Sequence, residues 1–172
     1  MDLLKDNIPK LVRKLAVPAM VGTLFQTLFN VVDTFFAGKI SPEALSALTK
    51  SFPIYFIIIA IGVGLTAGTN TLIGNNIGAN NKKKASLFVA QSIIFAIFLS
   101  ILVTFFGLNV SDFLLSIMGS DKEGIILSRK YLDIIFYGTV IVLIQISLNG
   151  VLNAQGDTKS YRNVLIFSFF LN

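Results

Sequence analysis

Long apolar runs are the feature that most restricts how this chain can fold. Four runs of about 22 residues each are long enough, at about 1.5 Å per helical residue, to cross the hydrocarbon core of a bilayer. They cover residues 15–37, 52–74, 86–108 and 131–153, and a fifth run begins near Arg162 and reaches Asn172. The runs predict an all-α, polytopic transmembrane helix bundle with four complete spans and the start of a fifth.

The composition supports this reading. Charged residues make up 13% of the chain, against about 25% in a typical soluble domain, and they gather between the apolar runs. The runs do not alternate apolar and polar residues, as the strands of a transmembrane β-barrel do. The net charge of +5 is therefore attributed to membrane topology, and nucleic-acid binding is not expected. The sequence has no Cys and no His, so a proton relay would have to use carboxylates.

The distribution of basic residues predicts the orientation. With the N-terminus inside, nine lysines and arginines fall in inner segments and five in outer loops, which favours a cytoplasmic N-terminus in a plasma (inner) membrane. Residues 1–14 are expected to form an amphipathic lead-in at the membrane surface. The first apolar run is too long for the core of a cleavable signal peptide and is expected to be retained. Lysines 82–84 have two interpretations, a topology determinant, which we favour, or a site for anionic lipid head groups.

Three polar side chains share one face of the first run. Gln26, Asn30 and Asp33 are spaced by four and then three residues, which places them together on a helix. A charged Asp in mid-bilayer costs about 2.5–3.5 kcal/mol on insertion scales, so such residues usually face a bundle interior or a water-filled cavity. We predict that this face lines a cavity with Asp33 as its titratable group. The alternative is that Asp33 lies at the outer interface and ends the helix.

Two further patterns lie in other spans. Gln145, Asn149 and Asn153 recur every four residues in the fourth run, where amides either hold helices together by hydrogen bonds or line the cavity that Asp33 faces. In the second run Ala60, Gly64 and Gly68 have the same spacing, which favours close helix packing, with helix bending as the alternative.

Catalytic motifs are missing from the sequence. It holds no phosphate-binding Gly-Lys motif, no nucleophile paired with His and no cluster of metal ligands. We therefore expect neither an enzyme nor an ATP-driven pump, and no cofactor.

Several segments together resemble a known family. Pro18, the segment FNVVDTFFAGKIS with Asp33, the segment GVGLTAGTNTLIGNNIGANNKKKA, and the hairpin LNGVLNAQGDTKSYRNVLIFSFFLN are similar to the N-terminal part of multidrug and toxic compound extrusion (MATE) transporters. The resemblance covers nearly the whole chain. It implies that residues 15–172 form part of one six-helix lobe, in a transporter whose two lobes enclose a central cavity.

The resemblance also implies a function. Family members export lipophilic, often cationic compounds in exchange for sodium or protons, and the first-span carboxylate, here Asp33, belongs to the cation site. Gln26 matches an amide near that site, while Asn153 and Asn172 resemble the fourth- and fifth-helix amides that share it. The expected partners are membrane lipids, drug-like small molecules and the remaining helices of the transporter. A partial lobe is expected to be inactive alone.

Three other functions remain open. One is a lipid-linked oligosaccharide flippase of the same superfamily, which would be expected to carry basic residues inside its cavity to hold pyrophosphate, and the spans have none at their centres. The second is a truncated membrane protein that transports nothing, because a partial lobe cannot form two gates. The third is a small channel assembled from several copies.

Overall fold

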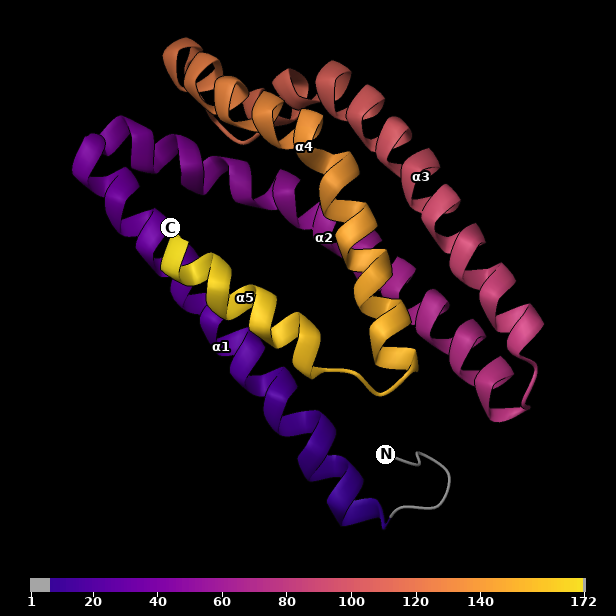
Figure 1. The fold of residues 1–172 in the computed structure, drawn as a ribbon. Helices are drawn as coiled ribbons and strands as arrows, with labels where there is room; N and C mark the ends of the chain where they lie inside the picture. Colours follow the sequence, from indigo (N-terminus) through magenta and orange to yellow (C-terminus); the bar gives the residue numbers. More distant parts are fainter. Residues whose placement is uncertain (1–6, 172) are drawn as a thin grey trace.

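Five long helices make up the structure, a computed structural model that describes residues 7–171. They are α1 (Ile8–Ile40), α2 (Pro42–Gly78), α3 (Lys82–Ile117), α4 (Lys122–Ala154) and α5 (Lys159–Leu171) (Figure 1). Four of them, α1 to α4, are long and apolar enough to cross a membrane. The predicted all-helical bundle with four complete spans and the start of a fifth is therefore confirmed.

Short polar turns separate the helices, and a side chain caps each of three helix starts. Ser41, Asn81 and Asp121 each accept a hydrogen bond from the backbone N–H three residues later, at the starts of α2, α3 and α4. These bonds satisfy N–H groups that have no partner inside a helix. Because the turns are so short, consecutive helices must run in opposite directions along the bundle.

The helices extend beyond the predicted spans. Residues 8–14, which the sequence assigns to a separate surface segment, are the first turns of α1, and Pro9 fits there because it lies in the first helical turn. Pro18, the fourth residue of the predicted span 15–37, consequently lies well inside α1. At the other end of the bundle α3 continues to Ile117, so the predicted loop over 109–130 is reduced to residues 118–121.

The helices form two groups. Helices α2, α3 and α4 pack together, while α1 runs beside α5 (Figure 1). The ring of Phe25 on α1 makes an edge-on contact with that of Phe169 on α5. Two ends of the bundle are distinguished below. The near end holds the start of α1 and the α2–α3 and α4–α5 turns, and the far end holds the α1–α2 and α3–α4 turns (Figure 1).

The core lies among α2, α3 and α4. Phe136, Leu132 and Leu143 of α4 and Ile58 of α2 are at most 2% exposed. Many equally apolar side chains lie on the outside, among them Phe105 at 62% exposed. A surface as apolar as the core is what a lipid environment requires, since lipid tails do not drive apolar side chains inward.

Glycines allow α2 and α4 to approach closely, but at positions other than the predicted ones. A Cβ at Gly150 would lie 3.1 Å from the carbonyl oxygen of Thr66, and one at Gly62 would lie 2.6 Å from Ile146 Cδ1. Thr66 Oγ1 also donates to the carbonyl of Ile146 at 3.2 Å. In contrast, a Cβ at Gly64 or Gly68 would meet no atom within 4 Å. The predicted packing stripe is therefore not the packing surface within residues 7–171.

Candidate functional site

Asp33 lies in the far half of α1, two turns before the helix ends, beside a cavity of about 440 Å³. The lining of this cavity comes from the end of α1, the start of α2 and the first part of α4. Its lining consists of Asp33, Phe36, Ala37, Ile40, Ala44, Ala47, Leu48, Leu127, Lys130, Tyr131 and Ile134. The carboxylate therefore faces a mostly apolar hollow.

Three polar side chains converge on this cavity from two helices. Asp33 comes from α1, and Lys130 and Tyr131 come from α4. Asp33 is exposed in the chain as described. A carboxylate can accept a proton or bind a cation, and an ammonium in the same cavity competes with such a cation for the carboxylate. No group of three or more His, Cys, Asp or Glu side chains placed to hold a metal ion occurs in residues 7–171, so a metal ion here would need oxygen ligands of other kinds.

The two amides predicted to accompany Asp33 are also placed on α1. Gln26 is exposed, about two turns nearer the start of the helix. Asn30 is exposed and lines a second, wider cavity of about 700 Å³. That cavity also contains Thr27 and Thr34 of α1 and Leu45 of α2. Asn30 and Asp33 thus share a helix face but do not line the same cavity.

The amides of α4 lie toward the near end. Gln145 is exposed, whereas Asn149 and Asn153 are half-buried. Asn149 Oδ1 is enclosed and accepts no hydrogen bond from residues 7–171. Asn153 lies in the last turn of the helix, where its carbonyl accepts from the N–H of Gly156. The remaining predicted residue, Asn172, lies outside the described residues.

Asp33 and the amides of α4 are not brought into one cavity. Tyr131 shares a cavity with Asp33, and Asn149 and Asn153 follow Tyr131 by 18 and 22 residues, about 27 and 33 Å along a helix. The reason is the alternation of direction: the start of α4 lies beside the far half of α1, and its end lies at the near end. The roles assigned to the amides of α4 therefore stay predictions.

Sequence reasoning missed Lys130 and Tyr131. Both directly precede the bulk of the fourth apolar run, where they look like ordinary interfacial residues. The signal that could have found them is again the alternation of helix direction, which places the start of the fourth helix beside the end of the first.

Asp133, near the start of α4, belongs to an ionic cluster at the far end. Arg129 Nε donates to Asp133 Oδ1 at 2.6 Å, and its Nη1 donates to Asp112 Oδ1 at 2.9 Å. The same guanidinium donates to the carbonyl of Leu108. One arginine of α4 thereby joins the end of α3 to α4.

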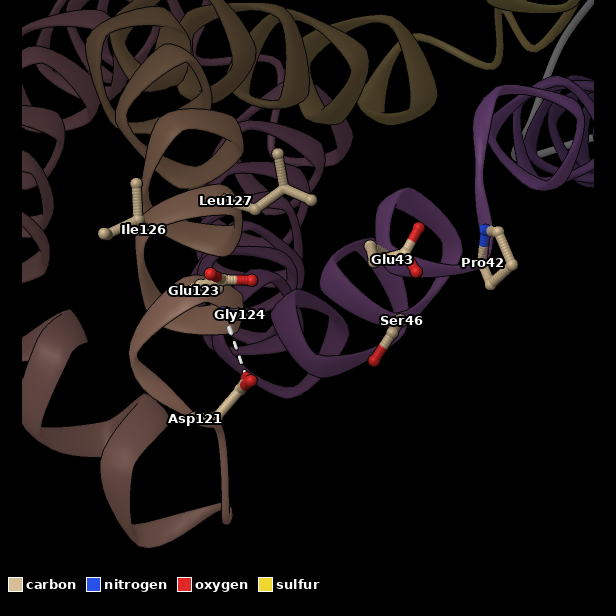
Figure 2. A pocket seen from close by; sticks show the side chains of 8 residues that line it. All are labelled: Pro42, Glu43, Ser46, Asp121, Glu123, Gly124, Ile126 and Leu127. Atoms are coloured by element: carbon tan, nitrogen blue, oxygen red, sulfur yellow. Dashed lines mark hydrogen bonds between the residues drawn. The ribbon is translucent and has the colours of Figure 1, made fainter.

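Another hollow at the far end contains carboxylates. It measures about 540 Å³ and lies between the starts of α2 and α4, with Glu43 on one side and Asp121 and Glu123 on the other (Figure 2). Asp121 is engaged in capping α4, through a 3.0 Å bond from the N–H of Gly124 (Figure 2). The acidic character of this hollow therefore derives in part from helix capping.

Curated proteins with similar sequences are transporters. The chain is 31% identical over 173 residues to a probable multidrug resistance protein NorM of Thermotoga maritima. It is 26% identical over 183 residues to the multidrug export protein MepA of Staphylococcus aureus, and 26% identical over 170 residues to an FAD transporter of Shewanella oneidensis. Each alignment covers at least 98% of this chain, yet the chain spans only 37–41% of the length of these relatives.

Solved structures share the fold. A multidrug resistance MATE family transporter of the MOP superfamily, in an outward-facing conformation, matches with a TM-score of 0.91 and 30% identity. A MOP superfamily transporter from Pyrococcus furiosus matches equally well, over 98% of this chain and 37% of its own. The family model MatE matches residues 18–172. The members of this family are transporters and not enzymes, and the chain belongs to the MatE family.

Proposed function

We propose that this chain is part of a cation-coupled exporter of lipophilic, often cationic compounds, in which Asp33 is the coupling carboxylate and sodium or a proton is the coupling ion. The observation that carries the proposal is the position of Asp33, on a membrane-length helix and beside a cavity formed by three helices. Relatives named as multidrug exporters support the substrate class.

The mechanism requires that Asp33 change its charge. The charge of a carboxylate depends on its surroundings, because a low-dielectric environment disfavours the ionised form and a nearby cation favours it. A proton or sodium ion entering from outside would neutralise Asp33. The neutral form of Asp33 favours a helix arrangement that releases the exported cation. Loss of the coupling ion favours the arrangement that binds the exported cation. Coupling of this kind needs only that each ligand bind the two arrangements with different affinity.

The test is the substitution Asp33→Asn in the complete transporter, expressed in bacteria that lack their own exporters. We expect ethidium efflux to fall to background with normal membrane expression, because an amide cannot alternate between charged and neutral forms. Asp133→Asn is the matched control, since Asp133 is paired with Arg129 outside the cavity. Unchanged efflux in Asp33→Asn would refute the coupling role.

We further propose that the 172-residue chain does not transport by itself. Residues 7–171 hold four membrane-length helices, and the chain spans only 37–41% of the length of its relatives. Alternating access needs a second wall that moves against the first. Expression of the 172-residue chain alone should leave ethidium accumulation unchanged. Efflux above that of empty-vector cells would contradict this proposal without affecting the role of Asp33.

A further inference from the structure

Charge is divided unequally between the two ends of the bundle. In the described chain the near end carries eight basic side chains and one carboxylate, Asp157. The basic side chains are Lys10, Arg13, Lys14, Lys82, Lys83, Lys84, Lys159 and Arg162. The far end carries five basic side chains and six carboxylates, among them the Arg129 cluster. Among residues 7–171, the charges of the far end therefore nearly cancel, whereas those of the near end have a large positive excess.

The helical hairpins create this asymmetry. The start of α1, the α2–α3 turn and the α4–α5 turn are far apart in the sequence, but all lie at one end of the molecule (Figure 1). Among the described residues the near-end carboxylate is Asp157, which accepts hydrogen bonds from the backbone and hydroxyl of Ser160. One carboxylate cannot balance the charge of the eight basic side chains described at this end.

Lysines 82–84 are the densest part of this charge, and they have no structural role within residues 7–171. All three are exposed, and their side chains form no hydrogen bond or ion pair there. They occupy the first turn of α3, which contains no acidic residue. Cations at a helix N-terminus oppose the helix dipole and destabilise the helix slightly. Neither packing nor helix stability accounts for them.

The position of these lysines identifies a ligand of suitable chemistry. They lie one to two turns from Leu87 and Phe88, where the apolar part of α3 begins, which is the depth at which phospholipid head groups meet a transmembrane helix. We propose that the α2–α3 turn, through Lys82, Lys83 and Lys84, binds the head groups of anionic phospholipids and enriches them around this end of the protein. This inference is independent of the role of Asp33.

The absence of tryptophan from the sequence allows a local measurement. A single Trp at Leu87→Trp reports on lipid beside the lysines, and Ile117→Trp reports on the opposite end of the same helix; both positions are lipid-accessible, at 54% and 67% exposed. Each variant of the purified chain is reconstituted in vesicles that mix brominated phosphatidylglycerol with phosphatidylcholine, and in the converse mixture. Bromine quenches the Trp only when the brominated lipid lies next to it. The two mixtures therefore give the binding constant of phosphatidylglycerol relative to phosphatidylcholine at each end.

The two reporters should differ. Pairing with one lysine makes the binding free energy of an anionic head group more favourable by about 1 kcal/mol. This corresponds to about a fivefold preference for phosphatidylglycerol at Leu87→Trp. At Ile117→Trp we expect the ratio of the binding constants of phosphatidylglycerol and phosphatidylcholine to be near one. The preference should weaken as salt rises, because exposed charges are screened. Equal ratios at the two reporters would overturn the proposal and leave the lysines as topology determinants only.

A charge-removing variant localises the effect. Substituting all three lysines by glutamine in the Leu87→Trp background should bring the ratio close to one. The matched control removes three lysines from the far end, Lys39, Lys50 and Lys122, and should leave the ratio at Leu87→Trp unchanged. A preference that survives in the K82Q/K83Q/K84Q variant would refute the assignment to this turn. The comparison of the two unsubstituted reporters decides the proposal even if a variant fails to fold.

Discussion

Gly107 of α3 lies against the ring of Phe136 on α4, so closely that a Cβ at Gly107 would overlap the ring. Phe136 is 2% exposed and belongs to the central core. One turn of α3 away, Thr104 Oγ1 donates to the carbonyl of Phe136 at 2.7 Å. The distance between α3 and α4 is thus fixed by Gly107, which has no side chain, and by the hydrogen bond from the hydroxyl of Thr104.

The contact predicts that Gly107→Ala destabilises the bundle. The added methyl must displace a buried ring, and overpacking of this kind costs about 1–3 kcal/mol. Gly64→Ala is the control, because a Cβ there meets no atom within 4 Å, and replacing Gly by Ala in a helix favours the helix by up to about 1 kcal/mol. Unfolding of the purified chain in mixed detergent micelles measures both. Equal effects of the two substitutions would contradict the packing described for Gly107.

The Arg129 cluster predicts a graded response at the far end. Arg129→Gln removes the bonds to Asp112, Asp133 and the carbonyl of Leu108, and we expect a loss of about 1–3 kcal/mol, in the range for hydrogen bonds to charged groups. Asp112→Asn should cost less than about 1 kcal/mol, because the Asp112 side chain is 62% exposed and water screens its ion pair. A larger loss in Asp112→Asn than in Arg129→Gln would contradict the central role of the arginine.

The turn between α4 and α5 predicts a dependence on pH. The pKa of the Asp157 carboxyl is lowered from its ordinary value of 3.8, first by the Ser160 hydroxyl and next by the Ser160 backbone N–H. Because the folded pKa is depressed, the stability contributed by this carboxylate is present above pH 3.8 and is lost as the pH falls through the lower folded value.

Asp157→Ala should therefore destabilise the start of α5 by about 1 kcal/mol at pH 7, as the loss of a helix cap does, and by less at pH 2.5. Ser160→Ala should have a smaller effect, since the backbone bonds to Asp157 remain. Amide hydrogen exchange of residues 159–163 measures the local opening at each pH. An effect of Asp157→Ala that is the same at both pH values would show that the charge is not responsible.

The sequence was sufficient for the elements of the fold and for several of its local details. Helix positions follow from runs of apolar residues of bilayer length, because a backbone in lipid must satisfy its own hydrogen bonds. The turn after α4 is equally local, since Gly156 has a φ of +77°, which suits glycine, and Asp157 accepts from the N–H groups that begin α5. Such features depend on neighbours within a few residues.

The contacts between helices were decided only by the tertiary structure. The regular spacing of Ala60, Gly64 and Gly68 predicted a packing surface, but the close contacts of α2 are made at Gly62 and Thr66, because helix rotation is set by the side chains of α4. In the same way, Asp33 lines a cavity with Lys130 and Tyr131 and not with the amides of α4. A period of four residues shows which side chains share a face, but the face that a helix presents, and the depth at which it meets its neighbour, depend on the whole assembly.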